Sequence, residues 1–420
     1  MTVLRKASSL YLLVFLVVCL AGSAFAQEIT FSSTQFVPIE EQEFARNHLL
    51  APFTEQTGIK VNLICEDDGP FFDRLTAEAR AGKAVSDVFG TLHGNVPILV
   101  AEGVAADLGD ITAIPGRTYI SEFVNLGQMD GKQVYVPWMQ ATYVMMANKK
   151  ALDYLPEGAD LNALTYEELL EWAKVLYEET GGPKLGLPAG PSGLFGRMLH
   201  GYLYPSFTGY QVSAFNSPEA VAMWEYLKEL NKYVHPSTGI WASMSDPLLF
   251  EEVWLAWDHT ARLTAAVREK PEEFIAFPAP AGPKGRAFIT VLTGIGVTKG
   301  SENFDAAMEL IKYLTSPDVQ VKVLEGTGFF PTTLEAVDHI PDGPEKILAD
   351  AVSRQAASPD AIVSLLPVGL GGRTGEFVPL YVDTYQAIVV MNRPIQETLD
   401  AQWALLKDLF ESMGAEYPNP

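Results

Sequence analysis

Cysteine is almost absent from this 420-residue chain, and basic residues are scarce. Its two cysteines are Cys19 and Cys65, and Cys19 lies in a segment that we expect to be removed. One remaining cysteine cannot form an internal disulfide, so the fold must rest on its hydrophobic cores. Lysine and arginine number 29 against 52 acidic residues, which gives a net charge of −23. Because such a surface repels nucleic acid and anionic lipid, we expect neither as a partner.

A long apolar run occurs near the N-terminus. Residues 10–20 are apolar, Arg5 and Lys6 precede them, and Ala24-Phe25-Ala26 follows them. A positive start, a short apolar stretch and an A-x-A site are typical of a cleaved secretory signal. We therefore predict a signal peptide over residues 1–26 and a periplasmic or extracellular mature protein.

Two other interpretations of the N-terminus fit less well. The apolar run is shorter than the roughly 20 residues that span a bilayer. A lipid anchor on Cys19 would need small residues just before it, and Leu16-Val17-Val18 does not provide them. Lipid anchoring stays open as an alternative to simple cleavage.

Catalytic and metal-binding motifs are also missing. The chain has no His-Glu-x-x-His, no Gly-x-Ser-x-Gly and no Cys/His cluster, and its six histidines are scattered. We expect no enzyme activity, no metal and no cofactor. Catalytic carboxylate pairs leave no such signature, so an exported carbohydrate-active enzyme stays open as an alternative.

Strand-like and helical runs alternate from the start of the mature chain. Strands are predicted at residues 29–32, 59–65 and 85–90, and helices at 42–57, 71–81 and 98–102. This order predicts an α/β fold in which helices cover both faces of a parallel sheet.

A second block of structure begins near Trp138. Thr165 and Glu168 form a capping box that predicts the start of a helix running to Glu179. Other predicted elements are a strand at 143–147, helices at 217–233, 304–315 and 394–413, and strands at 288–292 and 295–298. The Pro/Gly-rich stretch 277–283 is too short for a disordered linker and fits a passage between lobes.

Eight segments, in order along the chain, resemble the extracellular solute-binding proteins of ATP-driven (ABC) importers, in the carbohydrate-type family that includes maltose-binding protein. Each match alone is weak, but eight in order behind an export signal are a specific pattern. The segments are Phe53–Val61, Ser86–Phe89, Ala101–Leu108, Asp130–Pro137, Ala147–Leu152, Thr293–Ser301, Ala306–Pro317 and Gly326–Pro331.

The resemblance implies a periplasmic-binding-protein-like fold of two lobes, each with a mostly parallel sheet flanked by helices, that close on a ligand about a hinge. It implies capture of a small molecule and delivery to a membrane permease; this needs only a monomer. The implied division is residues 27–139 plus 284–333 for lobe 1 and 140–283 plus 334–420 for lobe 2. The implied passages lie near 137–142, 280–284 and 332–336.

Polar side chains that follow the first three predicted strands are candidate ligand contacts. Gln35 follows the first strand, Asp67 and Asp68 the second, and His93 the third. Ligands of open α/β sheets bind at the carboxyl ends of strands. The alternative is that Gln35 and His93 belong to solvated loops and that the aspartates serve a turn or a helix cap.

The segment 253–262 supplies further candidates, because polar residues follow an apolar strand there. Trp257 could cover a sugar ring, and Asp258 and Arg262 could bind its substituents. The alternative is that Trp257 packs in the core and Asp258 caps the next helix. This segment lacks the family's usual glycine-proline-tryptophan pattern, so it does not identify the ligand class.

Four candidates lie elsewhere in the chain. Trp138 and Tyr143 flank the first passage, where the alternative is packing within the hinge. Gly294 would allow close approach to the ligand, as would the Gly-rich loop 189–193 before Phe195. Arg373 lies in a polar loop, where it binds a ligand anion or stays solvated.

The ligand class stays open between two interpretations. The aromatic residues favour a sugar or oligosaccharide. Arg262 and Arg373 favour an anionic solute such as a phosphate ester, and paired tyrosines at Tyr202 and Tyr204 give a weak indication of a metal complex. A polyamine is a further alternative.

Overall fold

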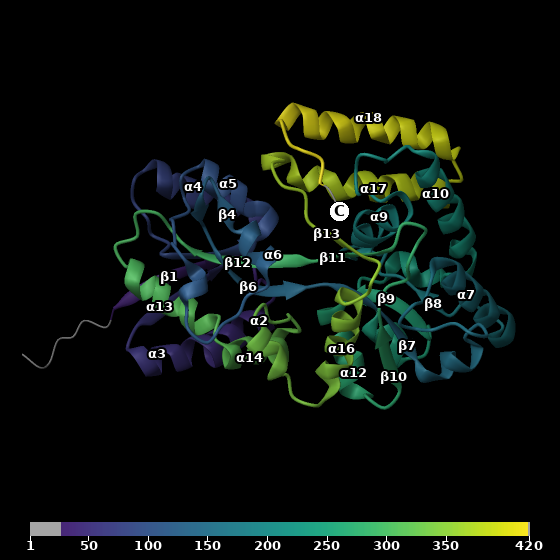
Figure 1. Ribbon diagram of the computed structural model, residues 1–420, viewed down its shortest axis with the longest axis horizontal. Coiled ribbons are helices and arrows are strands. Elements are labelled where there is room, and N and C mark those ends of the chain that lie inside the picture. Colours follow the sequence, from purple (N-terminus) through teal and green to yellow (C-terminus); the bar gives the residue numbers. More distant parts are fainter. Residues whose placement is uncertain (1–26, 419–420) are drawn as a thin grey trace, which may run out of the picture.

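The computed structural model describes residues 27–418, which form two lobes lying side by side (Figure 1). The predicted signal peptide, residues 1–26, lies outside the described residues. Within residues 27–418, no helix has both the length and the apolar character to cross a membrane. The predicted α/β class with two lobes is confirmed.

Lobe 1 is built on a five-stranded sheet of order β2-β1-β3-β12-β6. β1 pairs in parallel with β2 and β3, so the carboxyl ends of these three strands lie along one edge of the sheet. β12 runs antiparallel to β3 and β6. The strands are β1 (Glu28–Ser33), β2 (Lys60–Cys65), β3 (Val88–Leu92), β6 (Val136–Ala141) and β12 (Val291–Val297).

The first helical segment of lobe 1 runs without a break to Gly58, whose φ of 76° ends it as a left-handed cap. It comprises α2 (Ile39–Phe44), a π-helical stretch (Ala45–Leu50) and α3 (Ala51–Thr57). The other helices and a small hairpin are α4 (Asp68–Arg80), α5 (Val96–Ala101), α6 (Ser121–Leu126), β4 (Gln128–Met129), β5 (Lys132–Gln133), α13 (Phe304–Leu314), α14 (Pro317–Thr327) and α15 (Leu334–Asp338).

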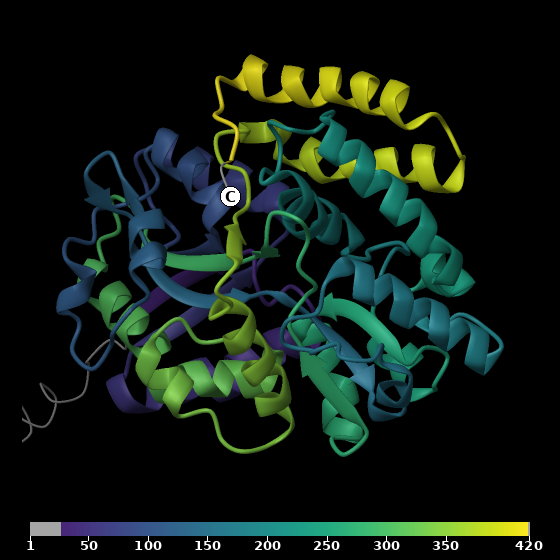
Figure 2. The same ribbon diagram turned by 45° about the vertical axis from the view of Figure 1, so that its right-hand side comes forward.

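Lobe 2 is built on a smaller sheet of order β10-β7-β9-β8. Its strands are β7 (Tyr143–Asn148), β8 (Leu185–Gly186), β9 (Leu255–His259) and β10 (Phe274–Phe277). Around it lie α7 (Tyr166–Thr180), α8 (Phe195–Met198), α9 (Tyr204–Thr208), α10 (Pro218–Leu230), α11 (Ser245–Leu249), α12 (Thr260–Glu269), α16 (Pro344–Ala356), α17 (Phe377–Tyr385) and α18 (Ile395–Met413). α17 and α18 lie one above the other over this lobe (Figure 2).

The strands of each sheet run mostly in one direction, as predicted, with one reversed strand in each: β12 in lobe 1 and β7 in lobe 2. β7 runs antiparallel to both β9 and β10, and only β8 pairs in parallel with β9. The physical reason for the reversal of β7 is that β6 continues directly into β7 across the lobes. A strand that is not joined to its neighbour by a helical crossover need not run parallel to it.

The passages between the lobes lie at the ends of these strands. β6 and β7 are separated only by Thr142, whose hydroxyl donates to Ile289 O at 2.8 Å. β11 (Arg286–Ile289) pairs with β13 (Ala361–Ser364) and not with the lobe 1 sheet. The return to lobe 1 therefore falls at Thr290, later than the predicted boundary at 284. α15 bonds to lobe 1 through Glu335 and Thr118, so the last passage follows α15 and also falls later than predicted.

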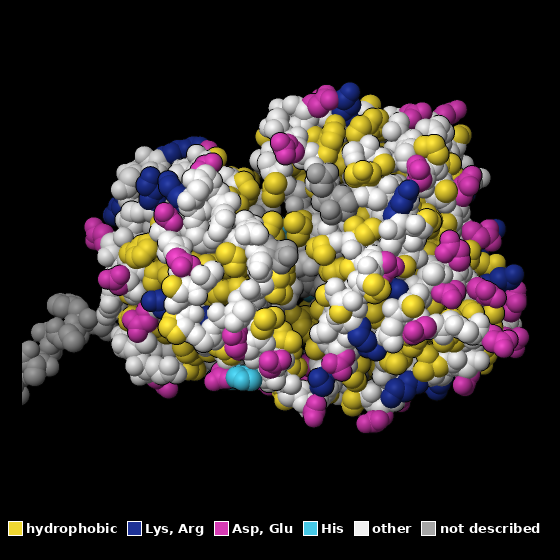
Figure 3. Space-filling view, viewed as in Figure 1, with side chains coloured by type: hydrophobic (Ala, Val, Ile, Leu, Met, Phe, Trp, Pro, Cys, Tyr) yellow, Lys and Arg dark blue, Asp and Glu magenta, His cyan; other side chains and the backbone are white. Residues whose placement is uncertain are grey.

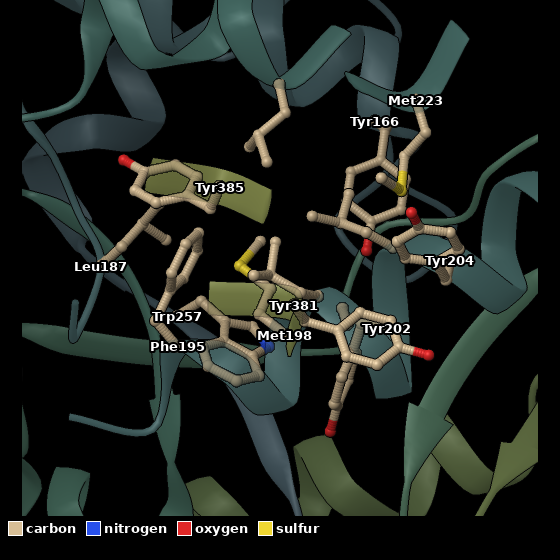
Figure 4. Packing of buried hydrophobic residues seen from close by; sticks show 14 of the residues in the cluster. Tyr166, Leu187, Phe195, Met198, Tyr202, Tyr204, Met223, Trp257, Tyr381 and Tyr385 are labelled. Atoms are coloured by element: carbon tan, nitrogen blue, oxygen red, sulfur yellow. The ribbon is translucent and has the colours of Figure 1, made fainter. Parts of the chain in front are cut away.

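The lobe 2 core is rich in aromatic residues (Figure 4). Trp257 of β9 lies among Phe195, Met198 and Tyr202, and it stacks on Tyr143 with ring centroids 4.7 Å apart. The predicted capping box at the start of α7 is confirmed, since the Thr165 and Glu168 side chains each accept a hydrogen bond from the other residue's backbone N–H. This core holds α8 and α17 against the lobe 2 sheet.

Candidate ligand-binding cleft

A cavity of about 640 Å³ lies between the two lobes. It begins at the carboxyl ends of β2 and β3, where α/β sheets bind ligands. The surface is notched between the α4–α5 side of lobe 1 and the α17–α18 side of lobe 2 (Figure 3). The polar and aromatic residues that line the cavity include Asp68, Phe72 and Asn95 from lobe 1 and Arg197 and Thr374 from lobe 2.

The lobe 1 wall is formed by the first turn of α4 and the turn after β3. Asn95 donates to Asp68 Oδ1 at 3.2 Å and to Thr91 Oγ1 at 3.3 Å, so it fixes the orientation of the carboxylate. Partial removal of water raises the pKa of Asp68 above its ordinary value, while the hydrogen bond from Asn95 acts in the opposite direction. Asp67 precedes α4 and is exposed outside the cavity.

The lobe 2 wall is formed by a tight turn and α8. The turn is close-packed, because a side chain on Gly193 would meet the carbonyl of Pro188. In α8, Phe195 and Met198 are buried in the core, whereas Arg197 is half-buried and lines the cavity. The packing of two apolar residues on one side of this short helix therefore presents a guanidinium to the ligand space.

Arg197 has neutral neighbours. Its Nη1 lies 3.4 Å from Nε2 of His200, and it also forms a hydrogen bond with the side chain of Tyr143. Because arginine only donates, the Nε2 atom of His200 must be the acceptor. Burial raises the pKa of Tyr143 to about 12, against the lowering effect of Arg197, so the phenol stays neutral.

Three buried histidines near Arg197, His93 on lobe 1 and His200 and His259 on lobe 2, are held in the neutral form. Burial lowers the pKa of His93 to about 4 and of His259 to about 3, and it lowers the pKa of His200 well below its ordinary value. The positive charge of Arg197 adds to each of these shifts. The guanidinium is therefore the principal charge on this side of the cavity at neutral pH.

Two predicted residues hold the lobe 2 wall together from behind. Asp258 is fully buried and accepts from the backbone N–H groups of Met244 at 2.8 Å and of His259 at 2.7 Å. Burial raises its pKa to about 7, although these bonds and Arg262 oppose the shift. Arg262 donates to the carbonyls of Ser192 at 3.0 Å and Ala242 at 2.5 Å. Arg262 thus positions the turn before α8, Asp258 fixes the start of α11 against the end of β9, and neither side chain lines the cavity.

The predicted tryptophans lie in cores and not on the cavity wall. Trp138 is 0% exposed in lobe 1, with its ring 5.6 Å from that of Phe31 and 5.4 Å from that of Phe36. Trp257 is 0% exposed in lobe 2 and stacks on Tyr143. These strand positions face the sheet–helix interface, so the packing alternative describes where both side chains lie.

Gln35, Gly294 and Arg373 also lie away from the cavity. Gln35 donates from its side chain to Thr34 Oγ1 at 3.2 Å. Gly294 does permit a close approach, but its neighbour is the ring of Tyr135, which a side chain at position 294 would meet at 2.4 Å. Arg373 is paired with Glu376 at 2.8 Å and with Asp408 at 3.2 Å, so its charge is already compensated.

The structure therefore brings only Asp68 of the predicted residues to the cavity. His93 lies behind this region, 1% exposed, with Nδ1 against the Leu292 backbone. Arg197 was not among the predicted residues. Its sequence position was a usable signal, because it lies four residues after Gly193, in a segment expected to approach the ligand. The prediction instead named Phe195 in that segment, and Phe195 is buried in the core.

A second cavity, of about 710 Å³, lies beside the passages and also touches both lobes. Gln140, Thr142 and Thr290 line it, together with apolar residues that include Phe123, Phe330 and Val352. We call it the hinge groove. It has no charged residue in its lining and lies away from the carboxyl ends of β2 and β3, so the smaller cavity is the better ligand site. Among the described residues, no cluster of histidine, cysteine or acidic side chains could hold a metal ion.

Solved structures show the same fold. Maltose-bound MalE3 of T. maritima is 19% identical, with a TM-score of 0.70 over 91% of this chain and 100% of that one. MalE of Xanthomonas citri is 14% identical, with a TM-score of 0.73 over 92% and 98%. UgpB of Mycobacterium tuberculosis, in complex with glycerophosphocholine, is 18% identical, with a TM-score of 0.69 over 93% and 100%.

Sequence comparison identifies the family. No curated protein is recognisably similar to the chain in sequence. A profile of the family described as "Bacterial extracellular solute-binding protein" matches residues 48–351, which is more than half of the chain. The predicted resemblance is thus confirmed, and the chain belongs to the bacterial extracellular solute-binding proteins, the receptors of ABC importers.

Proposed function

We propose that this receptor captures a small hydroxyl-bearing solute of the sugar class in the interlobe cleft and delivers it to the permease of its importer. The observation that carries the proposal is the cavity of about 640 Å³, to which both lobes contribute polar groups. Its size is within the range of small-molecule sites. Closure of the lobes about Thr142 and Thr290 would bring the two walls onto the ligand.

The cleft suits hydroxyl groups. Asp68 offers carboxylate oxygens, Asn95 and Thr374 offer further polar atoms, and Phe72 offers an aromatic surface. Charged acceptors bind hydroxyls more strongly than neutral ones. The lining includes only one aromatic residue, so a short ligand fits better than a long oligosaccharide stacked on several rings.

A phosphate-bearing solute is the second candidate, and Arg197 is the observation that favours it. The solved neighbours include proteins described with maltose and one described with glycerophosphocholine, so this fold accommodates both chemistries. A polyamine could pair with Asp68 and Asp73 but would also face the guanidinium on the lobe 2 wall, so it fits less well.

Binding without turnover is the proposed activity. The family consists of binding proteins, and the proposal extends this property to the present chain. Incubation with a bound solute, followed by chromatography of the recovered solute, should return it unchanged; a cleaved product would support the enzyme alternative.

The remaining parts of the proposal are export by cleavage after Ala26 and a monomeric mature form. Intact-mass spectrometry of the protein secreted by a bacterial host should give the mass of residues 27–420. Light scattering with and without solute should give one chain per particle.

Thermal-shift screening tests the binding proposal. A solute that binds only the native state raises the melting temperature by mass action. We expect a shift with a mono- or disaccharide or its phosphate ester, together with compaction in small-angle scattering. A set of such solutes that gives neither response would contradict the proposal.

A further inference from the structure

Arg197 is a cation that faces the cleft with no anion beside it. Among the side chains that the structure describes, no carboxylate oxygen lies within 4.0 Å of its guanidinium. A guanidinium only donates hydrogen bonds, so this charge needs acceptors from outside its own side chain. A half-buried charge of this kind is costly unless water or a ligand supplies acceptors. This wall is therefore positive in a chain whose net charge is −23.

The hydrogen-bonding capacity of Arg197 is also largely unused. Its side-chain partners are His200 Nε2, at 3.4 Å, and the side chain of Tyr143. Both are neutral groups on lobe 2. A guanidinium has five N–H donors in a planar fork, so most of them remain available toward the cavity.

The neighbouring groups cannot supply the missing negative charge. Both oxygens of Asp258 accept backbone N–H groups in the core. His93 is 1% exposed, and its Nε2 has no partner among the described residues. Asp68 lies on the opposite wall, where it accepts from Asn95. Asp73 also lines that wall, so the cavity has two carboxylates on the lobe 1 side and one unpaired guanidinium on the lobe 2 side.

We infer that the solute carries an oxyanion, either a phosphate or a carboxylate, that pairs with Arg197 while its hydroxyl groups reach Asp68 and Asn95. The inference rests on the proposed function of the cleft and names the ligand chemistry at that site. Phosphate and carboxylate oxygens match the planar fork of arginine in a bidentate pair, which a neutral sugar hydroxyl cannot do. The two walls would thus contact different ends of one ligand.

A direct ion pair between Arg197 and Asp68 in the closed state is the competing role. Such a pair would hold the lobes together without any solute and would leave no charge for a ligand. The two roles differ in what anions do: a ligand anion should bind the protein, whereas an interlobe ion pair should close the cleft in the absence of solute.

Calorimetric titration of the mature protein with four probes tests the inference. The probes are glucose 6-phosphate, glucuronate, neutral glucose and inorganic phosphate. The variants are Arg197→Gln, Arg197→Lys, which keeps the charge without the fork, and Arg80→Gln as the matched control. Arg80 lies on the lobe 1 surface with Glu102 and does not line the cavity. Melting temperature and near-UV circular dichroism show whether each variant is folded.

We expect at least one anionic probe to bind the unmodified protein at least tenfold more tightly than glucose does. Arg197→Gln should weaken that binding about tenfold or more, and Arg197→Lys should weaken it less, because a charge-assisted hydrogen bond contributes more than a neutral one. Arg80→Gln should leave it unchanged. The relative affinities for glucose 6-phosphate and glucuronate distinguish a phosphate ligand from a carboxylate ligand. Binding of inorganic phosphate shows whether the anion binds without a sugar.

Two results would overturn the inference in distinguishable ways. Glucose that binds equally to the unmodified protein and to Arg197→Gln, with no binding of the anions, leaves the proposed sugar receptor standing and removes the role of Arg197. If no anion binds and Arg197→Gln opens the unliganded protein in small-angle scattering, the interlobe ion pair is correct. If none of the four probes binds, the result counts against the inference and against the proposed function together.

Discussion

The ligand cleft and the hinge groove both lie between the lobes, yet they differ in chemistry. The cleft measures about 640 Å³ and carries charges at Asp68, Asp73 and Arg197. The hinge groove measures about 710 Å³ and is lined mostly by apolar residues such as Phe330 and Val352. Size alone would select the groove. Position at the ends of β2 and β3 and an unpaired charge select the cleft, whereas the groove lies at the end of β6 and has no charged lining.

The two cavities should also respond in opposite directions to hinge motion. Thr142 and Thr290 line the groove and not the cleft, and we expect the hinge axis to pass between the two spaces. Rotation that narrows the cleft then widens the groove and exposes its apolar lining to water. Exposure costs about 25 cal/mol per Å² of apolar surface. The groove thus favours the open state, and the ligand must overcome that preference.

Acid should destabilise the cleft side more than the groove side, and this is the largest effect we expect. Each histidine with a folded-state pKa below its unfolded value of 6.5 contributes stability that is complete above pH 6.5 and is lost as the pH falls toward the folded pKa. His93, His200 and His259 act in this way. Asp258 has a folded-state pKa of about 7, so between pH 4 and 6.5 it binds a proton in the folded state but not in the unfolded state. This uptake stabilises the fold as the pH falls and offsets the loss from one histidine.

The net expectation is a loss of roughly 2 to 3 kcal/mol per pH unit from these four groups below about pH 6. Denaturant unfolding at pH 7.0, 6.0 and 5.0 measures the slope, and His93→Gln should reduce it by about 1.4 kcal/mol per unit. Hydrogen exchange should rise first in α8 and β9 and later in α16. If His93→Gln leaves the pH dependence of stability unchanged, or if hydrogen exchange rises first beside the groove, then acid does not act mainly on the cleft side.

Truncation in the groove should cost stability without a matching loss of binding. Phe330 is 4% exposed, and its backbone pairs with Gln140 beside the passage. Phe330→Ala should lower the free energy of unfolding by about 3 kcal/mol, since it leaves a cavity in a packed region. Urea unfolding measures this loss, and calorimetry should show that solute affinity falls by less than about threefold. A loss of affinity equal to that of a cleft variant would mean that the two cavities are not distinct.

Much of the fold could be predicted from the sequence, because it depends on local pattern. The capping box at Thr165 and Glu168 placed α7, and apolar periodicity placed α4, α13 and α18 to within a few residues. The reversed direction of β7 could not be predicted in the same way. The path of β6 into β7 depends on how two lobes meet, and no local pattern records it.

The candidate site could be predicted only in part. Asp68 was found because it follows a strand directly, so its place depends on chain order. Trp138 and Trp257 lie inside β6 and β9, where large apolar side chains gain more by burial than by exposure. Arg197 was missed because its direction depends on Phe195 and Met198 occupying the core. Side-chain direction in the first turn of the helical segment 195–208 is decided by tertiary packing and not by sequence spacing.

Removal of the carboxylate on the lobe 1 wall should affect binding and leave stability unchanged. Asp68→Asn keeps the shape of the side chain and loses a charged acceptor, so solute affinity should fall about tenfold. Asp67→Asn is the matched control, because Asp67 is its neighbour in the chain and does not line the cavity. Calorimetry and urea unfolding on both variants measure the two effects. Equal losses of affinity in the two would show that the wall has been assigned to the wrong aspartate.

Bulk added to the hinge groove should give the smallest effect and the most direct test of the opposition between the two cavities. Val337 lines the groove and is 41% exposed, so Val337→Trp adds volume there without disturbing a core. If closure of the cleft widens the groove, the larger side chain should favour the closed state and tighten solute binding about two- to fivefold, by raising the population that is competent to bind. Scattering should show a slightly more compact unliganded protein. Val85→Trp, at an exposed valine that lines neither cavity, should change nothing. Weaker binding in Val337→Trp would show that the groove narrows on closure, and the hinge axis would then not pass between the two spaces as expected.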